Sequence, residues 1–202
     1  MNKMIKCLAA GMLALSLAGC GQKSVSELIG SNSNSKSDAE TGSSSAGDSS
    51  SSGVIYAQDG YADGNLGDTL GTAWCTFRVN SAKLADSYDG GIAPDEGETL
   101  LIVNVTLENT TEDDVPMFDA DFQAQWNSTG DEDYRYPVTL NGENAAAGNM
   151  LPEEYSIPVG ESMTGDLVFS VPQGFTDFSL SFMEYYDNEE TGDTFFVYFT
   201  AN

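Results

Sequence analysis

The 202-residue chain contains no histidine, and its seven Lys and Arg residues face 32 Asp and Glu residues. Without histidine, Ser-His and Cys-His nucleophilic catalysis is excluded, as are nearly all zinc and copper sites. The formal net charge of −25 falls entirely after residue 53, where only Arg78, Lys83 and Arg135 are basic. Such a surface repels phosphates and anionic lipid headgroups. The composition therefore excludes nucleic-acid binding, and we expect no enzymatic activity.

Long hydrophobic runs are also missing, since the longest extends only from Cys7 to Gly19, and a membrane-spanning helix needs about 20 apolar residues. Lys3 and Lys6 precede this run, which is typical of an export signal. The run ends in Leu17-Ala18-Gly19-Cys20, which resembles the bacterial lipoprotein signal. That resemblance implies a signal peptide at 1–19, cleavage before Cys20 and diacylglycerol on its sulfur. We therefore expect an exported protein whose membrane partner is reached through Cys20, anchored by lipid to the outer face of the cell membrane.

Cysteine is scarce, with Cys7 in the signal, Cys20 at the anchor and Cys75 beyond them. A single thiol in the folded part allows no intrachain disulfide. Cys75 alternates with Phe77 and Val79, which predicts that it faces inward as a small hydrophobic residue.

The segment that follows the anchor, residues 20–53, is dominated by Ser with Gly, Asn and Asp. Such a composition buries too little apolar surface to fold and predicts a disordered linker, with a root-mean-square span of about 30 Å. The folded domain is expected at 54–202, where every Phe, Tyr and Trp of the chain lies.

Within 54–202 the hydrophobic pattern is strict alternation rather than helical spacing, and polar turn clusters separate the runs. About seven short strands of this kind indicate an all-β fold, an antiparallel β-sandwich. The strands are expected at 73–81, 99–109, 119–126, 134–140, 161–172, 178–182 and 195–199. The stretch 141–155 shows no clear strand and could hold a helical turn.

Three pieces of the chain, in order, carry a family resemblance: GDTLGTAWCTFRVNSAKL, ETLLIVNVTLENTTEDDV and IPVGESMTGDLVFSVP. Together they resemble the bacterial immunoglobulin-like lipoprotein domain of unknown function, over roughly residues 66–202. The resemblance implies an immunoglobulin-like sandwich outside a bacterial cell. Because that family has no established common activity, it assigns no functional residue.

Acidic loops are the feature that suggests a specific ligand, since calcium takes six to eight oxygen ligands, often from loop carboxylates. The candidate ligands are Asp59, Asp63, Asp68, Glu112, Asp113, Asp114, Asp131 and Asp133. None of these stretches has the EF-hand order. The alternative is that these charges are solvated and keep strand edges apart. We expect no cofactor, with calcium as the one candidate.

Aromatic residues offer a second kind of site. Trp74, Trp126, Tyr185 and Tyr186 could form an exposed strip for sugars or a partner protein, or could simply pack across strands.

Two hypotheses about function follow from the sequence. The first is a lipid-anchored binding or interaction module for an envelope protein, peptide or wall component. The second is a calcium-dependent structural or adhesive envelope domain.

Overall fold

The structure is a computed structural model that describes residues 53–89, 91–126, 133–138, 148–186 and 190–202. The expected signal peptide, the lipid anchor at Cys20, nearly all of the linker and Asp131 lie outside these residues.

The described residues form short and long strands with a single turn of 3-10 helix at Asp119–Asp121. The strands are β1 (Val54–Tyr56), β2 (Tyr61–Asn65), β3 (Thr69–Gly71), β4 (Cys75–Ala85), β5 (Glu98–Asn109), β6 (Val115–Phe118), β7 (Phe122–Gln125), β8 (Tyr134–Arg135), β9 (Glu154–Ile157), β10 (Ser162–Pro172), β11 (Asp177–Tyr185) and β12 (Thr191–Thr200).

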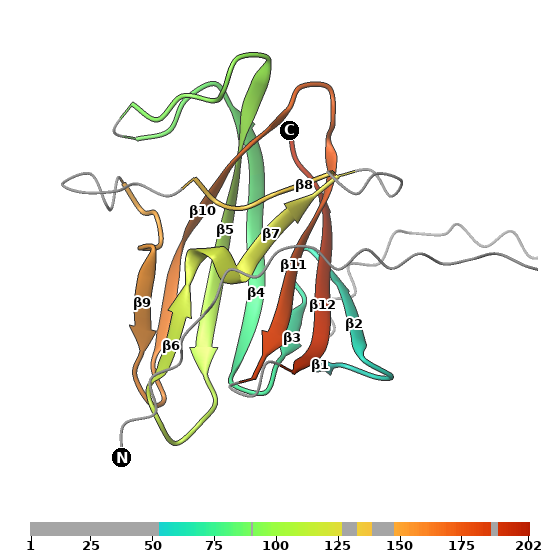
Figure 1. The fold of residues 1–202 in the computed structure, drawn as a ribbon, viewed down its shortest axis with the longest axis vertical. Coiled ribbons are helices and arrows are strands. Elements are labelled where there is room, and N and C mark those ends of the chain that lie inside the picture. The colour runs from blue at the N-terminus through green and yellow to red at the C-terminus, as the bar shows by residue number, and fades with distance from the viewer. Residues whose placement is uncertain (1–52, 90, 127–132, 139–147, 187–189) are drawn as a thin grey trace, which may run out of the picture. The chain divides into compact units, whose positions relative to one another are not determined.

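Two five-stranded sheets pack against each other as a sandwich, which confirms the predicted fold class (Figure 1). The first sheet has the order β1-β3-β4-β5-β10 and the second has the order β2-β12-β11-β7-β8. A separate antiparallel pair, β6 and β9, contributes Val115, Met117, Tyr155 and Ile157 to the core. The sandwich therefore has two large layers and a small flap of two strands.

Six of the seven expected strands correspond to β4, β5, β7, β10, β11 and β12. Of the strand expected at 134–140, only Tyr134–Arg135 forms β8; residues 136–138 are not in a strand, and 139–140 lie outside the described residues. Five others, β1, β2, β3, β6 and β9, have three to five residues each and were not expected. The antiparallel expectation was wrong at two places, because β1 pairs with β3 and β2 pairs with β12 in parallel. β1 and β3 belong to the first sheet and β2 to the second, so the chain crosses between the sheets at 57–60 and crosses back at 66–68.

Four phenylalanine rings fill the space between the sheets: Phe77 from β4, Phe122 from β7, Phe182 from β11 and Phe195 from β12. Phe122 and Phe182 have centroids 5.4 Å apart, and Phe77 lies 5.7 Å from Phe122. Removing one such ring typically costs about 3–5 kcal/mol of stability. The core therefore stabilises the domain without a disulfide among the described residues.

Cys75 is buried in this core, as the alternation predicts. Burial raises the pKa of its thiol to about 11, and the nearby Thr72 hydroxyl only partly opposes that shift. The thiol is therefore neutral at physiological pH and is not a nucleophile.

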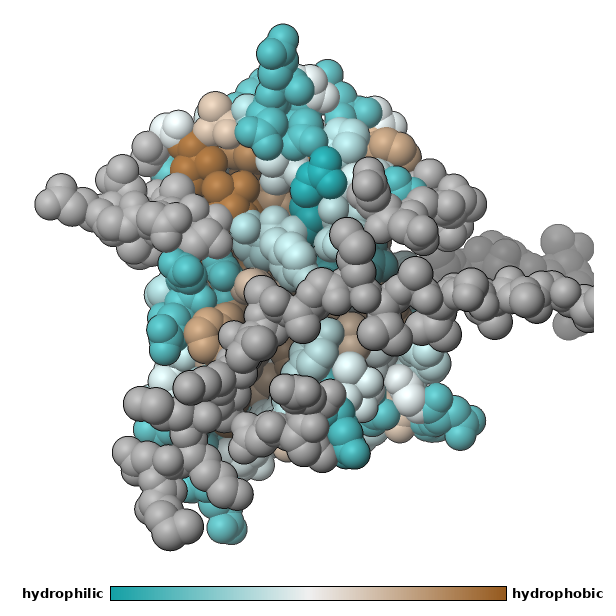
Figure 2. All heavy atoms as spheres, viewed as in Figure 1, coloured by the Kyte–Doolittle hydropathy of each residue, from teal (hydrophilic) through white to brown (hydrophobic). Residues whose placement is uncertain are grey.

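The described surface is mostly hydrophilic in the view of Figure 2, and the most extensive hydrophobic area in this view lies at upper left. No helix among the described residues is long and apolar enough to cross a membrane.

Candidate functional site

The calcium candidates near the start of the domain are engaged in local turns or stand alone. Asp59 lies in the turn before β2 with φ 55°, a left-handed conformation that Asp tolerates. Asp63 is exposed on β2, while Oδ2 of Asp68 accepts the N–H of Asn65 at 2.8 Å. The carboxylate of Asp68 therefore closes a turn.

The other acidic candidates lie in different loops. Glu112, Asp113 and Asp114 follow β5, where Asp114 Oδ1 accepts the N–H of Val159 at 3.2 Å. Asp133 immediately precedes β8. Within the described residues, no group of three or more His, Cys, Asp or Glu side chains could hold a metal ion. The calcium hypothesis therefore has no ligand cluster there on which to rest.

The four aromatic candidates do not form one strip. Trp126 is 4% exposed and packs inside, with the Arg135 guanidinium carbon 5.3 Å from its ring centroid. Trp74 is half-buried and lies 5.4 Å from Tyr186. Tyr185 is 60% exposed and sits at the end of β11. The expectation that Trp126 belongs to an exposed strip is wrong, because its strand turns it toward the core.

Glu184 joins three segments next to the Trp74–Tyr186 pair, although it is only 3% exposed. Its Oε1 accepts the N–H of Ala73 at 2.7 Å, and its Oε2 accepts the Asp193 N–H at 3.2 Å and the Tyr186 hydroxyl at 3.1 Å. A β-carbon at Gly192 would lie 2.5 Å from that Oε2, so only glycine fits there. Because both oxygens of Glu184 already accept hydrogen bonds from within the protein, this carboxylate stabilises the fold and is not available to a ligand.

Another acid, Asp121, is half-buried in the 3-10 turn between β6 and β7. Burial raises its pKa to about 6; the N–H of Phe118, which donates to Oδ2 at 2.8 Å, opposes the shift, and Asp119 adds to it. Burial also raises the pKa of Tyr155 well above its usual range, and its hydroxyl has no hydrogen-bond partner among the described residues. The Tyr155 side chain belongs to the core, where a substrate has no access.

The outward side of the second sheet, by contrast, carries exposed aromatic side chains, and we call it the outer face. Tyr61 is 62% exposed, Tyr136 is 50% exposed and Tyr198 is 49% exposed. Strand alternation places Phe196 and Tyr198 there, with their rings stacked at 6.2 Å. Tyr134 and Tyr136 meet edge-to-face at 5.8 Å. Sequence analysis did not single these residues out, although Phe196 and Tyr198 face away from Phe195 and Val197.

The register aligns one side chain from each of five strands across this face. Tyr198 pairs with Asn65 of β2 on one side and with Ser179 of β11 on the other. Ser179 pairs in turn with Gln125 of β7, and Gln125 pairs with Tyr134 of β8. We call these five residues the outer row. The short Ser179, only 7% exposed, forms its floor between the exposed rings of Tyr198 and Tyr134.

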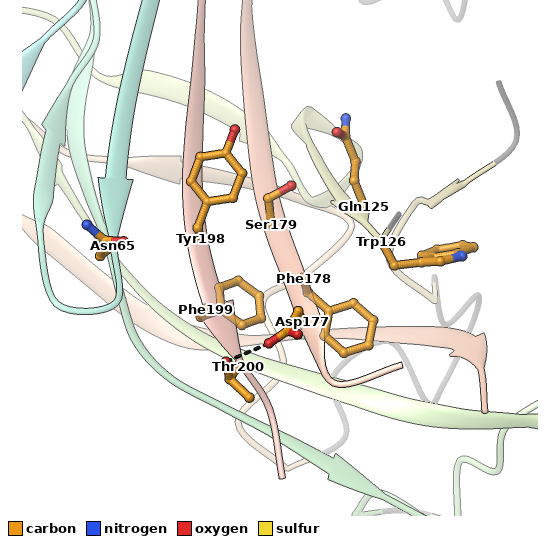
Figure 3. A pocket seen from close by; sticks show the side chains of 9 residues that line it. All are labelled: Asn65, Gln125, Trp126, Asp177, Phe178, Ser179, Tyr198, Phe199 and Thr200. Atoms are coloured by element: carbon orange, nitrogen blue, oxygen red, sulfur yellow. Dashed lines mark hydrogen bonds between the residues drawn. The ribbon is translucent and has the colours of Figure 1, made fainter. Parts of the chain in front are cut away.

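An open depression of about 440 Å³ is lined by four of these five residues, all except Tyr134. Figure 3 shows Tyr198, Ser179 and Gln125 projecting to the same side from three neighbouring strands. At one end Thr200 donates to Asp177 at 2.7 Å. The residues that line the depression are Asn65, Gln125, Trp126, Asp177, Phe178, Ser179, Tyr198, Phe199 and Thr200.

Comparison with known proteins places most of the described sandwich in one family. A family model described as "Domain of unknown function (DUF4352)" matches residues 64–191, and no curated protein matches the chain. A solved structure described as a "putative lipoprotein (ycdA)" from Bacillus subtilis subsp. subtilis str. 168 is 14% identical, with a TM-score of 0.48. That match covers 65% of this chain but only 38% of the other.

Two further solved structures are similar over nearly their whole length. The yjhA protein from Bacillus subtilis is 21% identical with a TM-score of 0.47, over 69% of this chain and 99% of that one. An "uncharacterized beta-sandwich protein" from Clostridium difficile 630 is 12% identical with a TM-score of 0.43, over 68% and 93% of the two chains.

Proposed function

Because the chain belongs to the DUF4352 family, whose domain is of unknown function, we propose from its own residues that it is a lipid-anchored, non-catalytic binding module of the bacterial envelope. The observation that carries this proposal is the outer face, on which Tyr61, Tyr136 and Tyr198 are each about half exposed or more. The rings form two separate pairs, Phe196–Tyr198 and Tyr134–Tyr136, and exposed tyrosine rings are enriched at interaction sites.

The absence of catalysis is supported by where the reactive groups lie. The chain has no histidine, and the Cys75 thiol is buried and neutral. The acid with the raised pKa, Asp121, lies in the 3-10 turn between β6 and β7 and is not among the residues that line the depression. The outer row consists of two tyrosines, a serine, an asparagine and a glutamine, so none of its five side chains is a carboxylate, imidazole or amine that could act as a general base.

The anchoring is supported by the sequence around Cys20, where the apolar run ends in Leu17-Ala18-Gly19. Two acyl chains suffice for stable membrane attachment. A flexible linker with a span of about 30 Å would let the sandwich turn its outer face toward wall material or neighbouring proteins. This arrangement suits a module that meets its partner outside the cell.

The binding role is tested by cosedimentation of the full-length chain, in mild detergent, with detergent-washed envelope fragments of the producing cell. We expect the wild-type chain to sediment with the fragments and the double variant Phe196→Ser/Tyr198→Ser to remain in solution. Val159→Ser is the matched control, because Val159 is 51% exposed in the turn between β9 and β10. Equal sedimentation of the wild type and the double variant, or none at all, would contradict the proposal.

A further inference from the structure

The outer row has the dimensions and rigidity of a site for an extended ligand. Neighbouring strands lie about 4.8 Å apart, so the backbones of β12 and β8, which carry Tyr198 and Tyr134 and are three strands apart, are separated by about 14 Å. Both rings come from paired strands, and Tyr134 is also held edge-to-face against Tyr136. Such a span exceeds one sugar ring and fits a short stretch of a chain-like ligand. A site on a rigid sheet loses little freedom on binding.

The polar groups between the rings both donate and accept hydrogen bonds. Gln125 Nε2 donates to Ser181 Oγ at 3.1 Å, which fixes the amide and leaves its carbonyl oxygen available. Asn65 carries a second exposed amide. The hydroxyls of Ser179 and Tyr198 form no hydrogen bond with any other described residue. Amides and hydroxyls are the groups that match the many hydroxyls of a carbohydrate.

The aromatic rings supply the other half of carbohydrate recognition. A ring has a negative face and a positive edge, so the C–H groups on the flat side of a sugar are attracted to it. Tyr198 and Tyr134 offer such rings at either side of the low Ser179 floor, and both are at least 39% exposed. Stacking on the rings and hydrogen bonds to the floor can therefore act on the same ligand.

The charged side chains around the outer row favour a neutral ligand. Asp177 lines the depression, and Asp63 lies close enough to Tyr198 to raise its pKa. These carboxylates would repel phosphate or carboxylate groups. Among the described cations, Arg78 and Lys83 lie on the other sheet, and Arg135 is paired with Glu98 at 3.2 Å. A cationic peptide is the competing partner, but the five side chains of the row are all uncharged, and none would pair with its lysines.

Resting on the proposed binding function, we infer that the outer row of Asn65, Tyr198, Ser179, Gln125 and Tyr134 is a binding site for a neutral polysaccharide. The two tyrosine rings stack on sugar units, and the serine and amides between them hydrogen-bond the sugar hydroxyls.

The test is affinity electrophoresis of the full-length chain in native detergent gels cast with one polysaccharide each. The neutral probes are dextran, mannan, amylose and galactan; the anionic probes are polygalacturonate and polyglycerol phosphate. We expect at least one neutral polysaccharide to retard the chain and neither anionic polymer to do so. A cationic probe, polylysine, is measured in parallel by titration.

Variants locate the site. Tyr198→Ala and Tyr134→Ala should each weaken binding to the retarding polysaccharide about tenfold, whereas Tyr198→Phe keeps the ring and should lose less than threefold. Val159→Ser again serves as the control, and circular dichroism checks that each variant is folded. Retardation unchanged by both alanine variants would overturn the site.

The other outcomes separate this inference from the proposed function. If the chain sediments with envelope fragments but no neutral polysaccharide retards it, the carbohydrate assignment fails and the binding module stands. Salt-sensitive binding of polylysine alone points to a cationic peptide and likewise overturns the carbohydrate. If neither envelope fragments nor polysaccharides are bound, both proposals fail.

Discussion

Replacing Glu184 by alanine tests whether this buried carboxylate holds the end of the sandwich together. The substitution removes the acceptor for two backbone N–H groups, those of Ala73 before β4 and Asp193 on β12, and for the Tyr186 hydroxyl. These donors come from three separate segments of the chain. The loss should therefore loosen the contact between the β3–β4 turn and the β11–β12 pair.

The expected loss of stability follows from the backbone N–H groups that Glu184→Ala leaves without an acceptor. A hydrogen bond to a charged group contributes about 1.5–3 kcal/mol, so the two backbone bonds together represent about 3–6 kcal/mol. Tyr186 is 42% exposed and its hydroxyl can turn to water, while Ala73 is also partly reached by solvent. We therefore expect a net loss of about 2–4 kcal/mol in the free energy of unfolding. For a domain of this size that lowers Tm by about 5–15 °C.

Thermal and urea unfolding of the full-length chain, followed by circular dichroism, measures this loss. Glu184→Gln should lie between wild type and alanine, because one amide oxygen still accepts while the amide nitrogen faces a donor. Glu154→Ala, at an exposed position of β9, should stay within about 0.5 kcal/mol of wild type. A Tm for Glu184→Ala within 2 °C of the Glu154→Ala control would refute the reasoning.

Two further predictions concern Asp121 and Cys20. The folded pKa of Asp121, about 6, lies above its ordinary value of 3.8, so the folded state binds the extra proton and stability falls as pH rises from about 4 to 6. The side chain of Asp121→Asn can still accept the Phe118 N–H but does not ionise. Between pH 4 and pH 7 the variant should therefore gain up to about 3 kcal/mol in the free energy of unfolding relative to wild type. Urea unfolding at both pH values measures this gain, which would be absent if the carboxyl were solvated. Cys20→Ala should move the protein out of the membrane fraction, whereas Cys7→Ala should leave it there; a Cys20→Ala protein that still fractionates with membranes would disprove the anchor.

Strand length explains how much of the fold could be predicted. The seven expected strands include β4, β5, β10 and β12, with 10 to 12 residues each, in which alternation repeats several times. β1 and β3 have three residues each, too few for any periodicity to appear. The parallel pairing of β2 with β12 joins segments about 130 residues apart, and no local pattern encodes such a contact.

Strand alternation already indicates that Trp126 faces inward and does not belong to an exposed strip. Phe122 is the inward anchor of its strand, and a period of two then places Ala124 and Trp126 on the same inward face. The same parity, counted from Phe195, turns Phe196 and Tyr198 outward. The outer row itself was beyond reach, because it depends on the order and register of five strands.

The two prominent features of the sequence, its acidity and its aromatic residues, act over different distances. Charges that surround the domain repel anionic polymers, but salt screens that repulsion beyond about 8 Å. A neutral polysaccharide is not repelled by these charges and can approach the outer row, where uncharged side chains would bind it by stacking and hydrogen bonds. Acidity would then select which polymers approach, and the rings of Tyr198 and Tyr134 would select which are retained. Raising the ionic strength should therefore leave neutral-polysaccharide binding unchanged, in contrast to any interaction with polylysine.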